Sequence, residues 1–170
     1  TEDRLERLRV RIQSLDAWLA ELGEAARSGD DARFDAGAAE AVADVLGATK
    51  TSLMILDAGS RSLHVVGAVG ASVPLEEMAP VPLGEGLAGV VAAQDDVLVL
   101  DDVGSDPRFR ERPFQKRYEA GALAVAPLRD GGRALGVLCA TDREDGAPFG
   151  DDEATLLRML AAHVAALLAR

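Results

Sequence analysis

The chain has few of the residues that define several large classes of protein. Its 170 residues include one cysteine, Cys139, which excludes an internal disulfide and a zinc site built from several cysteines. Aromatic residues make up only 4%, so aliphatic side chains and alanines have to supply most of the core. Basic residues number 18 against 29 acidic ones, a net charge of −11. This balance disfavours nucleic acid as a direct partner, because phosphates require a basic surface.

Long hydrophobic runs are also missing. No window approaches the roughly 18 apolar residues that cross a bilayer, and no stretch resembles a signal peptide. The apolar fraction of 48% nevertheless predicts a folded chain with a real core. We therefore expect a cytoplasmic protein without direct membrane contact, while the sequence does not show whether a longer parent protein is anchored to a membrane.

Both ends of the chain carry apolar residues at alternating steps of three and four. The N-terminal seam consists of Leu5, Leu8, Ile12, Leu15, Leu19 and Leu22, and the C-terminal seam of Leu157, Leu160, Val164 and Leu167. Together they predict a homodimer interface made by the terminal helices. For the first seam, the alternative is an amphipathic helix that folds back on its own domain.

Between these helices the pattern alternates between helix and hairpin signals. A helix is predicted from about Asp35 to Leu46, with hairpins at 51–69 and 122–141, the second turning at Asp130-Gly131-Gly132. Three prolines predict a loop over residues 70–82, and a charged helix is predicted at 112–119. The order predicts an α+β fold. Its antiparallel sheet of five or six strands has the terminal helices on one face and a segment crossing between the hairpins on the other, with a ligand pocket beneath that segment.

Four ordered stretches carry a resemblance to a known family. They are Ser52-Leu53-Met54-Ile55-Leu56-Asp57; Pro82-Leu83-Gly84-Glu85-Gly86-Leu87-Ala88-Gly89; Asp101-Asp102 through Asp106-Pro107-Arg108-Phe109; and Ala126-Pro127-Leu128 through Leu135-Gly136-Val137-Leu138 and Phe149. Residues from about 35 to 165 resemble a GAF domain, the small-molecule sensor module of signalling proteins, in a GAF/PAS-like arrangement. The implied layout is an N-terminal signalling or coiled-coil helix at 1–28, the GAF domain at 29–155 and a C-terminal helix at 156–170 that continues to an output domain.

The resemblance implies a non-catalytic sensory domain of a larger signal-transduction protein, for example the input of a histidine kinase or a cyclase. It implies a small-molecule ligand, with a cyclic nucleotide or dinucleotide as one candidate, and a relay through the helical dimer. The ligand and any cofactor stay unknown, because the family binds cyclic nucleotides, haem, bilins, metals and amino acids. The alternatives are a ligand-free dimerisation module and a metal-dependent sensor or enzyme that uses the acidic cluster described below.

No catalytic constellation and no set of metal ligands is evident, so the candidate site is a binding pocket. Its predicted residues are Met54, Leu87, Asp101, Asp106, Arg108, Phe109, Tyr118, Ala124 and Thr141. Ala122, Ala124 and Ala126 share one strand face, as do Gly136 and Ala140 on the next strand. Such small side chains either admit a closely packed helix or leave room for a ligand.

Several charged groups bear on the type of ligand. Cyclic-nucleotide-binding relatives carry an Asn-Lys…Phe…Asp-Glu pattern, where this chain has Asp142-Arg143, Phe149, Asp152 and Glu153. Aspartate replaces the asparagine and arginine replaces the lysine of this pattern. These replacements favour a structural ion pair between Arg143 and Asp152 over contacts to a nucleotide. The cations Arg108, Arg110, Arg112, Lys116 and Arg117 suit either an anionic ligand or a solvated surface.

The remaining polar candidates favour scaffold roles. An acidic cluster lies around the segment that crosses between the hairpins, and a solvent-exposed surface is favoured for it over a metal site. Its members are Asp95, Asp96, Asp101, Asp102, Asp106 and Glu111. Cys139 lies mid-strand, which disfavours a covalently attached bilin. His64 falls in a strand and His163 on the terminal helix seam, which disfavours a haem ligand.

Overall fold

The computed structural model describes residues 2–102, 106–107 and 122–170. The sheet contains β1 (Ala48–Asp57), β2 (Ser62–Val69), β3 (Val81–Pro82), β4 (Leu98–Leu100), β5 (Leu123–Asp130) and β6 (Arg133–Arg143). The helices are α1 (Glu2–Ser28), α2 (Asp31–Leu46), α3 (Gly86–Ala92) and α4 (Asp151–Leu168), with a 3-10 turn η1 (Leu75–Glu77). The six strands follow the order β3-β2-β1-β6-β5-β4, and every pairing is antiparallel. The predicted α+β architecture is confirmed.

Local sequence signals explain the helix ends. The Asp30 side chain accepts a hydrogen bond from the Arg33 backbone N–H, so α2 begins four residues before its predicted start. Gly47 ends the helix in the left-handed conformation, with φ of 68°, as its glycine predicted.

No helix among the described residues is long and apolar enough to cross a membrane.

Strand β3 was not predicted, because residues 70–82 contain three prolines. Its two residues pair with β2 at the edge of the sheet, Val81 opposite Leu63 and Pro82 opposite Ser62. Proline is tolerated there because an edge strand leaves some backbone N–H groups unpaired. The predicted charged helix at 112–119 lies outside the described residues.

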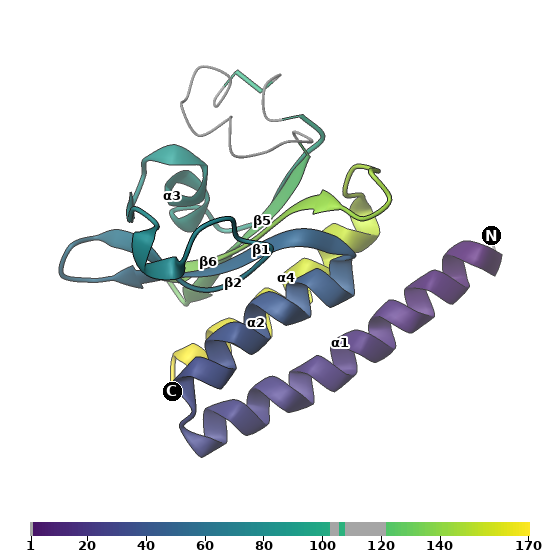
Figure 1. Ribbon diagram of the computed structural model, residues 1–170, viewed down its shortest axis with the longest axis horizontal. Helices are drawn as coiled ribbons and strands as arrows, with labels where there is room; N and C mark the ends of the chain where they lie inside the picture. Colours follow the sequence, from purple (N-terminus) through teal and green to yellow (C-terminus); the bar gives the residue numbers. More distant parts are fainter. Residues whose placement is uncertain (1, 103–105, 108–121) are drawn as a thin grey trace.

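One face of the sheet is covered by a layer of helices. Figure 1 shows α2 and α4 beneath the strands, with α1 on the outer side of that layer. The core between sheet and helices includes Leu53, Leu138, Ala124, Ala126 and Ala140. The three alanines therefore allow the helices to pack closely on the sheet. This outcome favours the first of the two interpretations of the small side chains, a closely packed helix, over room for a ligand. Ala124 consequently lies on the helix side of the sheet.

Helix α1 packs against its own domain. Leu15 and Leu22 are buried in the same core as α2 and α4, and the Trp18 indole N–H donates to the Asp44 carboxylate of α2 at 2.9 Å. His163 on α4 lies 3.1 Å from the backbone oxygen of Leu19, which joins α4 to α1. The alternative of an amphipathic helix that folds back is therefore what the structure shows for this face of α1.

Candidate functional site

The other face of the sheet carries a second apolar cluster beneath α3. Its buried members are Met54, Leu63, Leu87, Ala88, Val91, Ala92, Leu123, Val125 and Val137. Gly89 lets α3 lie directly against Pro82 of β3, because an added Cβ would lie 2.3 Å from the backbone oxygen of Pro82. Gly89 thus allows α3 to pack against the edge strand on this face of the sheet (Figure 1).

The same face continues into a polar half on the two central strands. In the β1–β6 register, Lys50 lies opposite Thr141 and Ser52 lies opposite Cys139. Directly opposed residues share a face, and so do residues two apart on one strand. The intervening Thr51 points the other way, since its hydroxyl donates to the Ala39 backbone oxygen of α2 at 2.6 Å. Lys50, Ser52 and Thr141, which we call the polar half-face, therefore lie on the α3 side.

The polar half-face contains one cation and several neutral groups. Lys50 Nζ lies 3.4 Å from an oxygen of the Asp142 carboxylate, and Thr141 is buried with 6% of its surface exposed. Cys139 is half-buried, and desolvation raises the pKa of its thiol to about 12 despite the opposing effect of a hydrogen bond with Ser52. The thiol is therefore neutral at physiological pH. This arrangement can offer ammonium and hydroxyl donors to a polar or anionic ligand.

The structure brings together only part of the predicted pocket. Met54, Leu87 and Thr141 share the α3 side of the sheet, whereas Ala124 faces the helices. Asp101 is exposed just after β4 and Asp106 is half-buried. Arg108, Phe109 and Tyr118 lie outside the described residues, as do the other predicted cations Arg110, Arg112, Lys116 and Arg117.

Lys50 was missed because the predicted strand began at Thr51, whereas Ser52 lay within the predicted strand but was not assigned to the pocket. Strand β1 in fact begins at Ala48, three residues earlier than predicted. An alternation extended back from Met54 places Ser52 and Lys50 on the same face as Met54. The sequence pattern that places Lys50 on this face was therefore present, but the predicted strand was too short to include it.

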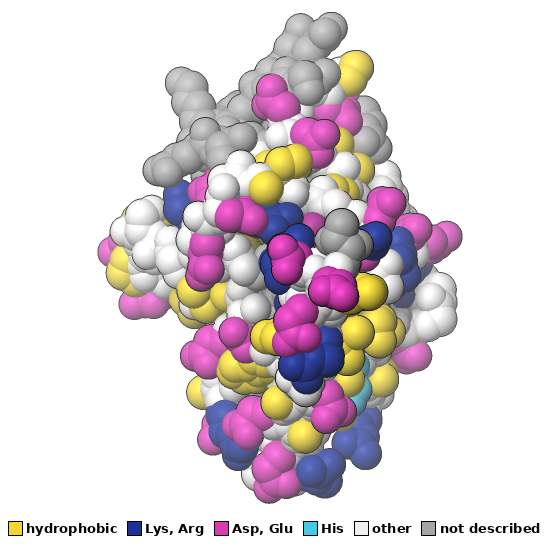
Figure 2. All heavy atoms as spheres, turned by 90° about the vertical axis from the view of Figure 1, so that its right-hand side faces the viewer, with side chains coloured by type: hydrophobic (Ala, Val, Ile, Leu, Met, Phe, Trp, Pro, Cys, Tyr) yellow, Lys and Arg dark blue, Asp and Glu magenta, His cyan; other side chains and the backbone are white. Residues whose placement is uncertain are grey.

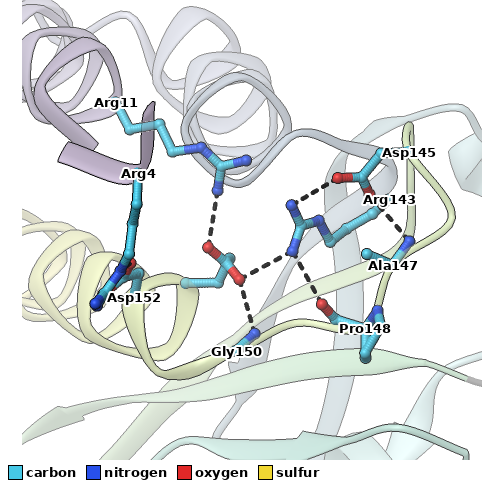
Figure 3. Close-up of polar contacts among 9 residues, drawn as sticks. Arg4, Arg11, Arg143, Asp145, Ala147, Pro148, Gly150 and Asp152 are labelled. Atoms are coloured by element: carbon cyan, nitrogen blue, oxygen red, sulfur yellow. Dashed lines mark hydrogen bonds and ion pairs between the residues drawn. The ribbon is translucent and has the colours of Figure 1, made fainter. Parts of the chain in front are cut away.

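Arg143 forms a structural tie with a different partner from the one predicted (Figure 3). Its guanidinium donates to Glu153 Oε1 at 3.0 Å, while Arg11 donates to Glu153 Oε2 at 3.0 Å. The Gly150 backbone N–H donates to the same carboxylate at 2.7 Å. The prediction that Arg143 pairs with Asp152 was wrong, because Asp152 points outward and pairs with Arg4 at 2.9 Å.

Two of the predicted acidic cluster are engaged with arginines. Asp96 accepts from Arg158 at 2.9 Å and from the Val97 backbone N–H at 2.7 Å. Asp95 lies 3.5 Å from Arg129. Among the described residues, which exclude Glu111, no group of three or more His, Cys, Asp and Glu side chains could hold a metal ion.

The predicted dimer residues fall into two groups. Leu15, Leu22, Leu157, Leu160 and Val164 are buried in the core of the chain itself. Leu8, Leu19 and Leu167 are half-buried, whereas Leu5 and Ile12 are 65% and 49% exposed. Met159 on α4 is also 50% exposed. A second molecule would therefore meet only the outer edge of the predicted seams.

One relative of the chain is a regulatory protein. The chain is similar to the Nif-specific regulatory protein of Herbaspirillum seropedicae, with 29% identity over 117 residues. The matched region is 66% of this chain but only 22% of that protein. The chain therefore spans about a fifth of the length of this regulatory relative.

Solved structures show the same fold at low sequence identity. One is the GAF domain of a phosphoenolpyruvate-protein phosphotransferase from Coxiella burnetii, with 21% identity, a TM-score of 0.75 and coverage of 92% of this chain and 94% of that chain. Another is the free methionine-R-sulfoxide reductase of Neisseria meningitidis, with 20% identity, a TM-score of 0.77 and coverage of 95% and 90%. The same fold therefore occurs in a domain of a phosphotransferase and in a reductase.

The family model described as GAF domain matches residues 35–168. The match takes in α3, all six strands and α4, which are the elements that build both faces of the sheet. It covers most of the chain, and the predicted resemblance is confirmed: this chain belongs to the GAF domain family.

Proposed function

We propose that this GAF domain is a non-catalytic regulatory input of a larger signal-transduction protein, and that it binds a small molecule on the α3 side of its sheet. The observation that carries the proposal is the polar half-face beside the apolar cluster under α3. Small-molecule sites are typically apolar with a few convergent polar groups. Lys50, Ser52 and Thr141 supply such groups from two adjacent strands.

The available donors favour a ligand that carries negative charge or strong acceptors. The Lys50 ammonium carries three N–H donors, of which Asp142 at 3.4 Å engages part, and the two hydroxyls donate one hydrogen bond each. A cyclic nucleotide or dinucleotide satisfies this requirement and stays the candidate class. A chemical role is disfavoured, because the Cys139 thiol with a pKa of about 12 is a poor nucleophile.

A ligand at the polar half-face would lie close to the contacts of the terminal helices. Thr141 is two residues before Arg143, which is tied through Glu153 to α4 and to Arg11 of α1. A ligand that prefers one arrangement of this segment would bias the packing of both helices. The regulatory relative, of which the chain spans 22%, supports a covalently linked output domain.

We propose that the relay works in a homodimer, with Leu5, Ile12 and Met159 as the contacts. These large apolar side chains are about half exposed or more, and Figure 2 shows hydrophobic side chains among charged ones on the side of the molecule that includes the start of α1. Light scattering should give a dimer that Leu5→Glu with Ile12→Glu disrupts. The matched control is Val10→Glu, since Val10 is 50% exposed outside both predicted seams. A monomer at high micromolar concentration would remove the physical basis of the relay.

A second function, a dimerisation module without a ligand, is favoured by one specific observation. Met54 and Leu87 lie together in the apolar cluster, so side chains of the chain itself occupy the space under α3. In that case the domain would contribute only an interface. The two functions differ in whether any small molecule stabilises the fold.

A thermal-melt comparison with cyclic AMP, cyclic GMP and cyclic di-GMP tests the proposal. A ligand at a hundred times its dissociation constant adds about 2.7 kcal/mol, which raises the midpoint by several degrees. Thr141→Val removes one hydroxyl at nearly constant shape and should reduce this shift. The control Thr155→Val changes an exposed residue of α4 and should leave the shift intact. If none of the three compounds raises the midpoint, the dimerisation module becomes the better account.

A further inference from the structure

A cavity of about 560 Å³ lies at the hairpin end of the sheet, away from the polar half-face. It is bounded by the β1–β2 turn, the β5–β6 turn, the end of α3 and the last turn of α4. Figure 1 shows these hairpin ends at the left, on the side where the chain ends. The apolar part of its lining includes Ile55, Leu56, Leu83, Leu135 and Leu168. This volume falls within the range of small-molecule sites, about 300–1,000 Å³.

The charged groups that line the cavity are all arginines. Arg61, Arg129 and Arg133 contribute to its wall, and the described lining residues include no carboxylate. The chain as a whole has 29 acidic against 18 basic residues, so a lining with three arginines departs from its average composition. Carboxylates outside the lining, Asp95 and Asp130, lie 3.5 Å from Arg129 and Arg133. Cationic clefts with low-dielectric walls attract anions.

Arg61 is held in an unusual backbone conformation. Its φ is 55°, in the left-handed region that residues with a Cβ rarely adopt and that a hairpin turn ordinarily fills with glycine or asparagine. Its side chain is exposed, and its guanidinium has no ion-pair or hydrogen-bond partner within the described part of the chain. The turn thus presents a free cation at a position where glycine would fit better.

Arg129 is fixed in place by the backbone around it. Its guanidinium donates to the backbone oxygens of Ala92 at 3.1 Å and Gly132 at 2.7 Å, so its orientation is set before any ligand arrives. Its Nε is buried without a hydrogen bond within the described residues, although the exposed Asp95 carboxylate lies 3.5 Å away. Arg133 at the rim is 68% exposed and lies 3.5 Å from Asp130. The cavity therefore combines one preorganised and two adjustable guanidinium groups.

We propose that this cavity binds a small organic anion, a molecule with a carboxylate, phosphate or sulfonate group on an apolar body. Guanidinium groups match such oxyanions with paired, charge-assisted hydrogen bonds. The aliphatic side chains of the lining receive the apolar body. Lys50, Ser52 and Thr141 do not line this cavity, so the site is separate from the ligand face proposed above and stands or falls independently of it.

The test uses a pair of fluorescent probes with similar apolar bodies. 8-Anilinonaphthalene-1-sulfonate carries an anionic group, and N-phenyl-1-naphthylamine does not. The variant combines Arg61→Asn, because asparagine tolerates the left-handed conformation, with Arg133→Gln; Arg129 is kept because it ties the backbone. Arg7→Gln removes one charge from an exposed position of α1 and serves as the matched control.

The wild-type chain should bind the sulfonate probe, and the double variant should bind it roughly tenfold more weakly through loss of two charge-assisted contacts. The neutral probe should bind both proteins equally, and Arg7→Gln should behave as wild type. Amide NMR signals of Ala58, Gly132 and Leu168 should shift with the sulfonate probe. The proposal is overturned if the sulfonate probe does not bind, if the double variant binds it as tightly as wild type, or if the shifted signals lie outside the cavity.

Discussion

Glu153→Gln tests the network that joins the sheet to both terminal helices. The Glu153 carboxylate receives hydrogen bonds from Arg143, from Arg11 and from the Gly150 backbone N–H. The side chains of Glu153, Arg143 and Arg11 are only 11%, 13% and 21% exposed. The substitution keeps the shape of the side chain but removes its charge. Arg143 keeps its ion pair with Asp145 at 2.9 Å, whereas the largely buried Arg11 loses the carboxylate that it faces.

The size of the effect follows from this burial. Removing one partner of a buried ion pair costs about 3–5 kcal/mol, because the remaining charge is left buried and uncompensated. The loss is smaller here, because the glutamine oxygen still accepts one of the hydrogen bonds and Asp145 still pairs with Arg143. We therefore expect the free energy of unfolding to fall by about 2–4 kcal/mol. For a chain of this size that corresponds to a midpoint lower by roughly 5–15 °C.

Urea denaturation followed by circular dichroism measures the loss directly. Asp152→Asn is the matched control one residue away, because its partner Arg4 is 62% exposed and solvent screens the pair. Its effect should be much smaller than that of Glu153→Gln. Equal losses in the two variants would refute the reasoning, since they would show that the buried network is no stronger than a surface pair.

Three further predictions concern other parts of the fold. Gly67→Ala should lower the free energy of unfolding by about 1–3 kcal/mol in urea, because the new Cβ would lie 2.1 Å from the Asp35 backbone oxygen, whereas Gly132→Ala has nothing within 4 Å. Burial and the nearby Asp31 raise the pKa of Asp35 from 3.8 to about 6, so the folded state binds this proton more tightly and stability should fall as the pH rises from about 4 to about 6. Asp35→Asn should therefore gain on the order of 1 kcal/mol relative to wild type between pH 4 and pH 7, after allowance for partial exposure. Cys139 is half-buried and desolvation raises the pKa of its thiol to about 12, so it should react with iodoacetamide at pH 8 more slowly in the native protein than in urea.

Each of these has a clear contrary result. A Gly67→Ala variant as stable as Gly132→Ala would mean that the strand can shift away from α2 at little cost. An Asp35→Asn variant whose stability follows that of wild type at every pH would show that Asp35 is well solvated. Equal reaction rates of Cys139 in the folded and unfolded states would show an open thiol.

Local signals in the sequence predicted the elements where one residue type decides the conformation. Gly47 ends α2 in the left-handed conformation, and the turn at Asp130-Gly131-Gly132 joins β5 and β6 as expected. Both depend on φ > 0 or on tight turns, which glycine marks in the sequence. Strand β3 was not predicted, because its pairing with β2 is a tertiary contact that overrides the local effect of the prolines.

The surfaces that the seams cover could not be decided from periodicity. A stripe at steps of three and four fits equally well against the chain's own core and against a second copy. Leu15 and Leu22 are buried against the chain's own core, whereas the exposed Leu5 and Ile12 are the residues proposed to contact a second copy. Similarly, the sequence could not show which of two adjacent acids reaches Arg143, because a shift of one residue turns a helix by about 100°.

The measurement that tests the sensory role most directly is an amide NMR titration of the chain with cyclic AMP, cyclic GMP and cyclic di-GMP. The account predicts that one of these compounds shifts the signals of Lys50, Ser52 and Thr141 together, with smaller shifts at Arg143 and along α4. If saturating concentrations of all three leave these signals in place, the account of a cyclic-nucleotide sensor is contradicted and the dimerisation module takes its place.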